Sequence, residues 1–318
     1  MSQVDWLSQL LQMITVTGRL EVRCAYGAPW RVSWPQAAAD EIPYHIVLKG
    51  RAILKDSKLE TATELMGGDI VLLPHGSEHV LDDGSGEAPA PTHNRRDSGG
   101  WMLSENDGSG ERLDLLCGRF FVRQPHDRLI RNYLPTNVVI RASDSNTDEG
   151  VSSASQHLTG LMGLMRLEST SDKLGGNAVL NALSSALFTL VLRAASESEH
   201  APAGLLALAG HPRLAPAISA LFADPARPWK LPELADLCSM SRATFMRHFQ
   251  NKLGRSAIEL LTDIRMSLAA NELTKPGITT AAVAESVGYQ SEAAFRRAFA
   301  EWMGMTPGQW RRSAREGQ

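Results

Sequence analysis

The last third of the chain contains the same short pattern twice, about 50 residues apart. The first copy is LADLCSMSRATFMRHFQNKLG at 234–254, and the second is VAESVGYQSEAAFRRAFAEWMG at 283–304. In each copy two Phe residues four positions apart form an apolar stripe, and an Arg between them lies off that stripe. Each copy therefore predicts a short helix, a tight turn and a second helix, which together make a helix-turn-helix unit.

Capping residues support this interpretation. Ser241 and Ser291 stand where an N-cap belongs, because a side-chain oxygen there can accept from the exposed N–H groups that open a helix. Gly254 and Gly304 stand where a left-handed residue ends a helix. Apolar residues at helical spacing over 257–273 predict a central helix between the two units.

The region from Trp229 to Arg312 resembles the C-terminal DNA-binding domain of AraC/XylS-type transcription regulators, and its closing MGMTPGQWRR is similar to the family's G-x-T/S-P-x-x-Y/W-R ending. The resemblance implies a sequence-specific regulator that binds double-stranded DNA, acts with RNA polymerase and forms a homodimer. It also implies recognition helices in two major-groove segments about 34 Å apart. The implied DNA-facing positions are Ala243, Met246 and Arg247 in the first unit, with Arg242 beside them, and Glu292, Ala293, Arg296 and Arg297 in the second.

Charge is distributed in agreement with a DNA partner. Residues 212–318 hold 14 Lys and Arg against 10 Asp and Glu, a net of +4, while the whole chain has a net charge of −3. Cations near the recognition helices neutralise phosphates and release counterions, so binding is expected to weaken steeply with salt.

The first half of the chain has the pattern of an all-β sandwich or barrel, with short strand-like runs separated by Gly, Pro, Asp and Ser. GDIVLLPHGSEH at 68–79 matches the second cupin motif, G-x5-P-x-G-x2-H. This half therefore resembles the cupin-type sensor domain of one AraC subgroup, to which LCGRFF at 116–121 is also similar. The runs that predict strands are 19–23, 31–34, 44–48, 52–54, 69–73, 113–116 and 120–122.

The predicted fold class is α+β, with a cupin-like β-barrel sensor at 1–145, a helical linker at 146–210 and an all-α DNA-binding domain at 211–318. Residues 82–112 are rich in Gly, Ser, Pro and charge and predict a mobile insertion, in which Trp101 is either a lid contact or part of an unstructured loop. Apolar spacing from 151 to 194 predicts helices that pack on the barrel or pair two subunits.

Three histidines suggest a metal. His45, His75 and His79 come from two strands that a cupin fold places side by side, and imidazole binds zinc, iron, nickel or copper. The first cupin motif is reduced to YHIVLKG, where His45 stands alone. A transition metal, simple hydrogen bonding of these rings, and a metal-dependent cupin enzyme all stay open as interpretations, although an enzyme needs at least three firm ligands.

Three cysteines do not make a disulfide framework. Cys238 lies at a helix-turn-helix turn and is predicted to be structural. Cys24 and Cys117 lie on strand-like segments of the sensor half with Arg23 and Arg119 close in sequence, and cations favour the reactive thiolate. They are candidates for oxidant sensing, with a pair of buried core thiols as the alternative.

The N-terminus lacks the basic start and cleavage site of a signal peptide, and no run of about 18 apolar residues suggests a membrane span. The chain is therefore expected to be cytoplasmic, with no membrane partner. A signal sensed by the cupin domain, either an oxidant or a small molecule or metal, is expected to control DNA binding.

Overall fold

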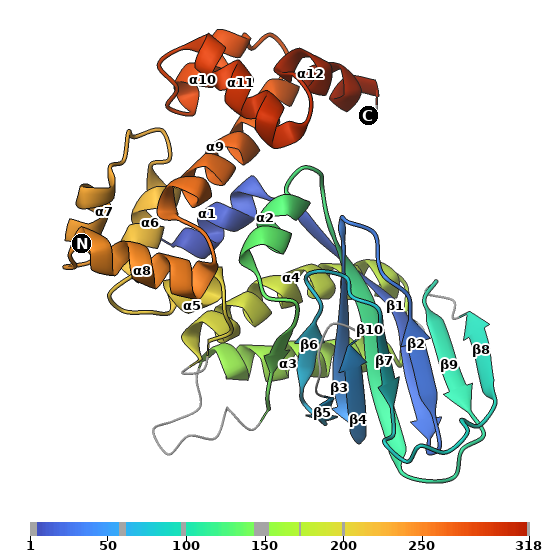
Figure 1. Ribbon diagram of the computed structural model, residues 1–318. Coiled ribbons are helices and arrows are strands. Elements are labelled where there is room, and N and C mark those ends of the chain that lie inside the picture. The colour runs from blue at the N-terminus through green and yellow to red at the C-terminus, as the bar shows by residue number, and fades with distance from the viewer. Residues whose placement is uncertain are drawn as a thin grey trace. The chain divides into compact units, whose positions relative to one another are not determined.

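The computed structural model describes residues 5–56, 62–96, 100–142, 153–171, 173–198 and 201–316. These residues form two compact units, each assembled from segments that are far apart in the sequence (Figure 1). The sheet unit combines Val16–Val122 with Leu134–Pro202. The helical unit combines the described parts of Met1–Thr15, Arg123–Tyr133 and Ala203–Gln318. The chain therefore crosses between the units four times.

The sheet unit contains two sheets. The larger has seven strands in the order β11-β6-β3-β10-β1-β9-β8, and the smaller has four in the order β2-β7-β4-β5. The strands are β1 (Val16–Gly27), β2 (Arg31–Trp34), β3 (Glu41–Lys49), β4 (Arg51–Asp56), β5 (Thr63–Met66), β6 (Ile70–Leu72), β7 (His79–Asp82), β8 (Thr92–Arg96), β9 (Met102–Asn106), β10 (Arg112–Val122) and β11 (Val138–Ile140).

The core of this unit lies between the two sheets. Successive side chains of a strand point to opposite faces, so alternate residues of each strand enter the core. Tyr26, Val47 and Leu115 come from the larger sheet, and Leu54 and Leu81 come from the smaller one. All five are buried, and together they confirm the predicted cupin-like β architecture.

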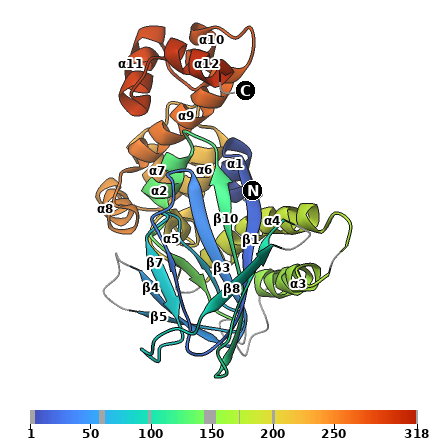
Figure 2. The ribbon, with the colours of Figure 1, turned by 90° about the vertical axis from the view of Figure 1, so that its right-hand side faces the viewer.

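Two helices, α3 (Ser153–Glu168) and α4 (Gly176–Glu197), lie beside the larger sheet, and α4 packs along β1 (Figure 2). The Gly18 amide donates to Ser185 Oγ over 2.8 Å, and the rings of Phe120 and Phe188 have centroids 5.0 Å apart. A Cβ at Gly18 would lie 2.5 Å from the backbone carbon of Ser184, so only glycine allows this close approach. Of the two predicted roles for these helices, α4 fulfils the packing role.

By length and composition alone, α4 could cross a membrane, since its most apolar 18-residue window has a mean hydropathy of 1.6. Polar residues interrupt its apolar run, so the sequence did not indicate a membrane span here. Its apolar residues include Leu180, Leu187 and Val191, which are buried in the sheet unit. These residues form the face of α4 that packs within the sheet unit.

The prediction of a mobile insertion over residues 82–112 is wrong for two segments. Thr92–Arg96 and Met102–Asn106 form β8 and β9, and β9 extends the larger sheet by pairing in parallel with β1. Trp101 between them is 7% exposed, so it is not part of an unstructured loop, and its role as a lid contact stays a prediction. All five residues of β8 are exposed, and an edge strand of that kind lacks the apolar alternation that marks a strand in a sequence. Residues 97–99 lie outside the described part of the chain.

The helical unit carries both predicted helix-turn-helix units. Its helices are α1 (Trp6–Met13), α2 (Asp127–Tyr133), α5 (Leu205–Ala209), α6 (Ala215–Ala223), α7 (Leu231–Leu237), α8 (Arg242–Leu253), α9 (Ala257–Thr274), α10 (Thr280–Ser286), α11 (Glu292–Met303) and α12 (Pro307–Glu316). Helices α7 and α8 form the first unit, α10 and α11 form the second, and α9 is the predicted central helix between them.

The predicted caps are confirmed. Ser241 Oγ accepts from the Thr244 amide and Ser291 Oγ from the Ala294 amide, each over 3.2 Å. Gly254 and Gly304 end α8 and α11 with φ of 70° and 77°. These caps fix where each recognition helix begins and ends, which determines the residues that it exposes.

Candidate nucleic-acid interface and thiol pair

Each helix-turn-helix turn needs one residue with left-handed backbone. Ser239 has φ of 50° in the first unit, and Gly288 has φ of 83° at the corresponding position of the second. A Cβ at Gly288 would lie 2.1 Å from the carbonyl oxygen of Ala226. The second turn therefore requires glycine both for its backbone angle and for its close contact with residue 226.

The recognition helices pack through their phenylalanines. Phe245 and Phe249 of α8, like Phe295 and Phe299 of α11, are at most 1% exposed, with ring centroids 4.7 Å apart in α8 and 5.6 Å apart in α11. The residues predicted to face DNA therefore lie on the outer sides of these helices. Seven of them are exposed and Glu292 is partly buried: Arg242, Ala243, Met246, Arg247, Glu292, Ala293, Arg296 and Arg297.

The arginines of this surface differ in their pairing. Arg296 Nε donates to Glu292 Oε1 one turn earlier, over 2.7 Å. Among the described residues, Arg242, Arg247 and Arg297 form no ion pair. Their guanidinium groups are therefore available to phosphates or to the acceptor edge of guanine, whereas Arg296 must first exchange its carboxylate partner.

Strand pairing brings Cys24 and Cys117 together in the core of the sheet unit. In the antiparallel register of β1 and β10, Cys24 is opposite Leu115 and Cys117 is opposite Val22, so the cysteines are diagonal neighbours on one face. They are 1% and 3% exposed, so both sulfurs lie in the core and perturb each other's acidity. Both are free thiols.

The two thiols differ in acidity. The neighbouring Cys117 thiol, with a smaller contribution from Tyr26, holds the pKa of Cys24 below its ordinary value although burial opposes this. Burial, together with the neighbouring Cys24 thiol, raises the pKa of Cys117. Cys24 is therefore the first of the pair to become a thiolate.

The arginines that are close to these cysteines in sequence do not supply this activation. Arg23 pairs with Asp114 over 2.9 Å, and Arg119 lies 3.4 Å from carboxylates of Glu21 and Glu41. Alternation along β1 also places Arg23 on the sheet face opposite Cys24, whereas Arg119 is held by its two carboxylates. Tyr26, and neither arginine, contributes to lowering the pKa of Cys24. Sequence reasoning missed this residue, although it lies two positions after Cys24 and therefore on the same strand face.

His45 and His79 meet in the same core. Their Nε2 atoms are 2.8 Å apart, the ring of Trp34 stacks on His79, and His79 Nδ1 donates to the Ser77 carbonyl over 2.7 Å. With the His79 proton on Nδ1, His45 is the donor between the rings. Burial lowers the pKa of both histidines, so both rings are neutral at pH 7.

A metal site needs more than these two rings. His75, the third predicted ligand, instead has its Nε2 3.0 Å from the Leu134 carbonyl. Across the described residues, no three His, Cys, Asp or Glu side chains are placed to share a metal ion. A zinc ion would also require the two Nε2 atoms to separate to about 3.3 Å, since each Zn–N bond is about 2.0–2.1 Å. The donor set therefore does not fit a bound metal as it stands.

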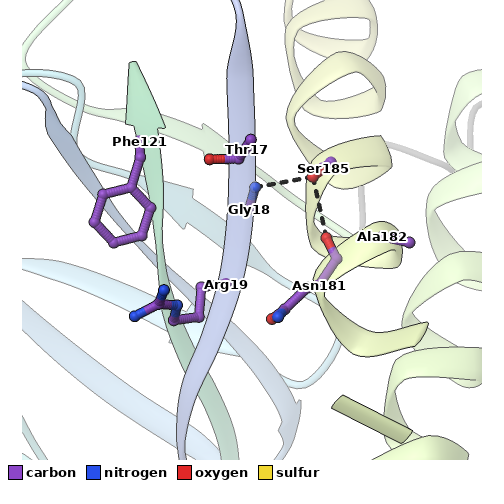
Figure 3. A pocket seen from close by; sticks show the side chains of 7 residues that line it. All are labelled: Thr17, Gly18, Arg19, Phe121, Asn181, Ala182 and Ser185. Carbon is purple, nitrogen blue, oxygen red and sulfur yellow. Dashed lines mark hydrogen bonds between the residues drawn. The ribbon is translucent and has the colours of Figure 1, made fainter. Parts of the chain in front are cut away.

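A pocket of about 300 Å³ lies between β1 and α4 (Figure 3). Its lining includes Arg19, Phe121 and Asn181, and the Arg19 guanidinium lies 5.4 Å from the centre of the Phe121 ring. Ser185 joins the walls by accepting from the Gly18 amide and donating to the Asn181 carbonyl (Figure 3).

Comparison with known proteins assigns both halves of the chain. A cupin family matches residues 5–197, and a helix-turn-helix domain family matches residues 234–313. The chain is 32% identical to the HTH-type transcriptional regulator MtrA of Neisseria gonorrhoeae, over 97% of this chain and 98% of that protein. The chain belongs to the AraC-type transcription regulators with an N-terminal cupin domain. This family membership places it among regulators rather than cupin enzymes.

The chain is also similar to two further proteins. The regulator is 26% identical to the RCS-specific HTH-type transcriptional activator RclR of Escherichia coli, over 98% of this chain and 99% of that protein. It is also similar to the DNA-binding domain of AdpA, solved in complex with a target DNA. That similarity is 26% identity over 34% of this chain and 96% of the other, with a TM-score of 0.31.

Proposed function

We propose that this DNA-binding regulator senses a small two-electron oxidant through Cys24 and Cys117. The observation that carries the proposal is the strand register that makes the two buried thiols diagonal neighbours on one face, and the lowered pKa of Cys24 supports it. A thiolate with a second thiol in contact has both groups that a reversible switch needs, an attacking and a resolving cysteine. Burial of both sulfurs restricts access to small oxidants such as a peroxide.

The chemistry balances with the two cysteines and one peroxide. The Cys24 thiolate attacks one peroxide oxygen, the O–O bond breaks, and Cys24 becomes a sulfenic acid while water or an alcohol leaves. Cys117 sulfur then attacks the Cys24 sulfur, the S–O bond breaks and water leaves. The two thiols have together lost two electrons and two protons, and the peroxide has gained both.

A disulfide between these positions changes the strand pair. Diagonal neighbours in an antiparallel pair have Cα atoms about 7–8 Å apart, whereas a disulfide usually spans about 4.4–6.8 Å. Strands β1 and β10 must therefore approach or shift locally when the bond forms. A close-packed core transmits such a shift rather than absorbing it, so oxidation would also move the residues that pack against β1 and β10.

The test measures DNA binding before and after peroxide for wild type, Cys24→Ser and Cys117→Ser, with Cys238→Ser as the matched control. We expect oxidant to change binding by wild type and Cys238→Ser and to leave both other variants unresponsive. Peptide mapping should find a Cys24–Cys117 disulfide. A full response in both variants would contradict thiol switching and favour a small-molecule ligand, for which the pocket beside Arg19 is the first place to search.

We further propose that the regulator acts in the cytoplasm as a homodimer and recruits RNA polymerase. Its relative RclR is named as a transcriptional activator, which supports activation. Leu164 and Leu167 on α3 are 55% and 67% exposed and support self-association, since exposed apolar side chains gain from mutual burial. Sedimentation of wild type and Leu167→Lys tests the dimer, and a monomeric wild type would contradict it. Transcription in vitro with purified polymerase tests activation, and unchanged transcript levels would contradict it.

A further inference from the structure

Helix α2 comes from the stretch of chain between two strands of the sheet unit, yet it packs within the helical unit. Its Leu129, Ile130 and Tyr133 are buried there. The helix lies more than 100 residues before residues 234–313, the part that matches the helix-turn-helix family. A segment so remote in sequence needs specific contacts to hold it in place.

One buried carboxylate supplies those contacts. Asp263, on central helix α9, is 7% exposed. Its Oδ2 accepts from the Tyr133 hydroxyl over 2.5 Å, and its Oδ1 accepts from Trp302 Nε1 over 2.8 Å. Asp263 thus joins three helices, since Tyr133 lies on α2 and Trp302 lies on recognition helix α11. A buried carboxylate loses heavily if either donor is removed, so the three helices hold one another in position.

A second contact joins α2 directly to α11. The Arg128 guanidinium lies 5.3 Å from the centre of the Trp302 ring and donates to the Trp302 carbonyl oxygen. That carbonyl belongs to the last turn of α11, where backbone oxygens lack partners within the helix and the helix dipole is negative. Arg128 therefore acts as a cationic cap provided by another segment.

The first helix-turn-helix unit lacks an equivalent of Trp302. The two copies are offset by 50 residues along their recognition helices, so Lys252 of α8 corresponds to Trp302 of α11. The Lys252 carbonyl accepts from the Gly204 amide over 2.9 Å and not from α2. The contacts through Asp263 therefore act on the second recognition helix in particular.

We propose that Tyr133 and Arg128 of α2 are positioning residues for DNA recognition, which fix recognition helix α11 on α9 through Asp263 and Trp302. The position of the second recognition helix thus depends on α2, a segment that lies outside residues 234–313, the part that matches the helix-turn-helix family. Cys117 precedes α2 by only ten residues along the same chain. The inference rests on DNA binding by α11 and not on the thiol switch, so all tests use the reduced protein.

The experiment uses full-length Tyr133→Phe and Arg128→Ala with DNA selected by the wild-type protein. Affinity is measured for the complete site and for the same site with the segment bound by α11 scrambled. Tyr133→Phe is expected to lower affinity for the complete site about tenfold, because one hydrogen bond to a buried carboxylate is lost. The scrambled site should show less than a twofold change, since α11 no longer contributes there.

Tyr44→Phe is the matched control, since it removes another buried tyrosine hydroxyl, 2.8 Å from Ser184 Oγ in the sheet unit. It should leave the ratio of the two affinities unchanged. Trp302→Phe should reproduce the loss of Tyr133→Phe, and the double variant should lose less than the product of the two single effects. Equal losses on complete and scrambled sites, unchanged binding to both, or fully multiplicative losses would overturn the proposal.

Discussion

Truncating Phe299 to alanine should release the second recognition helix while leaving the sheet unit folded. Phe299 is fully buried in a cluster with Met266, Ala270 and Phe295, which connects α11 to α9. Removing a buried phenyl ring costs about 3–5 kcal/mol through lost transfer energy and the cavity that remains. Local opening of α11 would therefore become about 10²- to 10⁴-fold more frequent.

Hydrogen exchange read by peptide mass spectrometry measures this opening directly. Peptides from α11 of Phe299→Ala should lose protection by that factor, while peptides from β3 and β10 keep theirs. Phe299→Leu should show a much smaller loss, and Phe249→Ala should produce the corresponding effect in α8. Unchanged protection in α11, or an equal loss throughout the sheet unit, would refute this packing account.

Four further experiments each test one feature of the structure. Arg242→Ala should make the slope of log affinity against log salt shallower by about 0.9, as one phosphate contact is lost, and an unchanged slope would contradict the contact. Protein purified without chelator should carry less than one metal ion per chain by elemental analysis, because no described His, Cys, Asp or Glu joins His45 and His79 as a third ligand. Burial lowers the pKa of His126, so its contribution to stability is complete above about pH 6.5 and is lost as pH falls further. The urea midpoint should therefore fall less from about pH 7.5 to about pH 5.5 in His126→Asn than in wild type. Gly288→Ala should abolish specific binding in a mobility-shift assay, since a Cβ there meets a backbone carbonyl.

The helical unit could be predicted in detail because its signals are local. Duplicated phenylalanines, Ser241 and Ser291 as N-caps, and Gly254 and Gly304 as C-caps each act within one or two helical turns. The cupin motif similarly indicated the β architecture. Strand β8 was missed because an exposed, polar edge strand has no alternation for a sequence to show.

Long-range contacts could not be derived in the same way. The proximity of Cys24 and Cys117 depends on the register of β1 with β10, which contains an irregularity between Leu20 and Val22. The docking of Tyr133 on Asp263 joins residues that are 130 positions apart. No periodicity or cap marks such a contact, because it depends on how complete elements pack.

We propose that α8 and α11 are the two DNA-reading helices of this regulator. The most direct test of this proposal is footprinting on DNA selected by the reduced wild-type protein, repeated with Arg247→Ala and Arg297→Ala. We predict two protected major-groove segments per chain, about 34 Å apart, with each substitution weakening one segment by about 1–3 kcal/mol. A single protected segment, or two substitutions that weaken the same segment, would contradict the account.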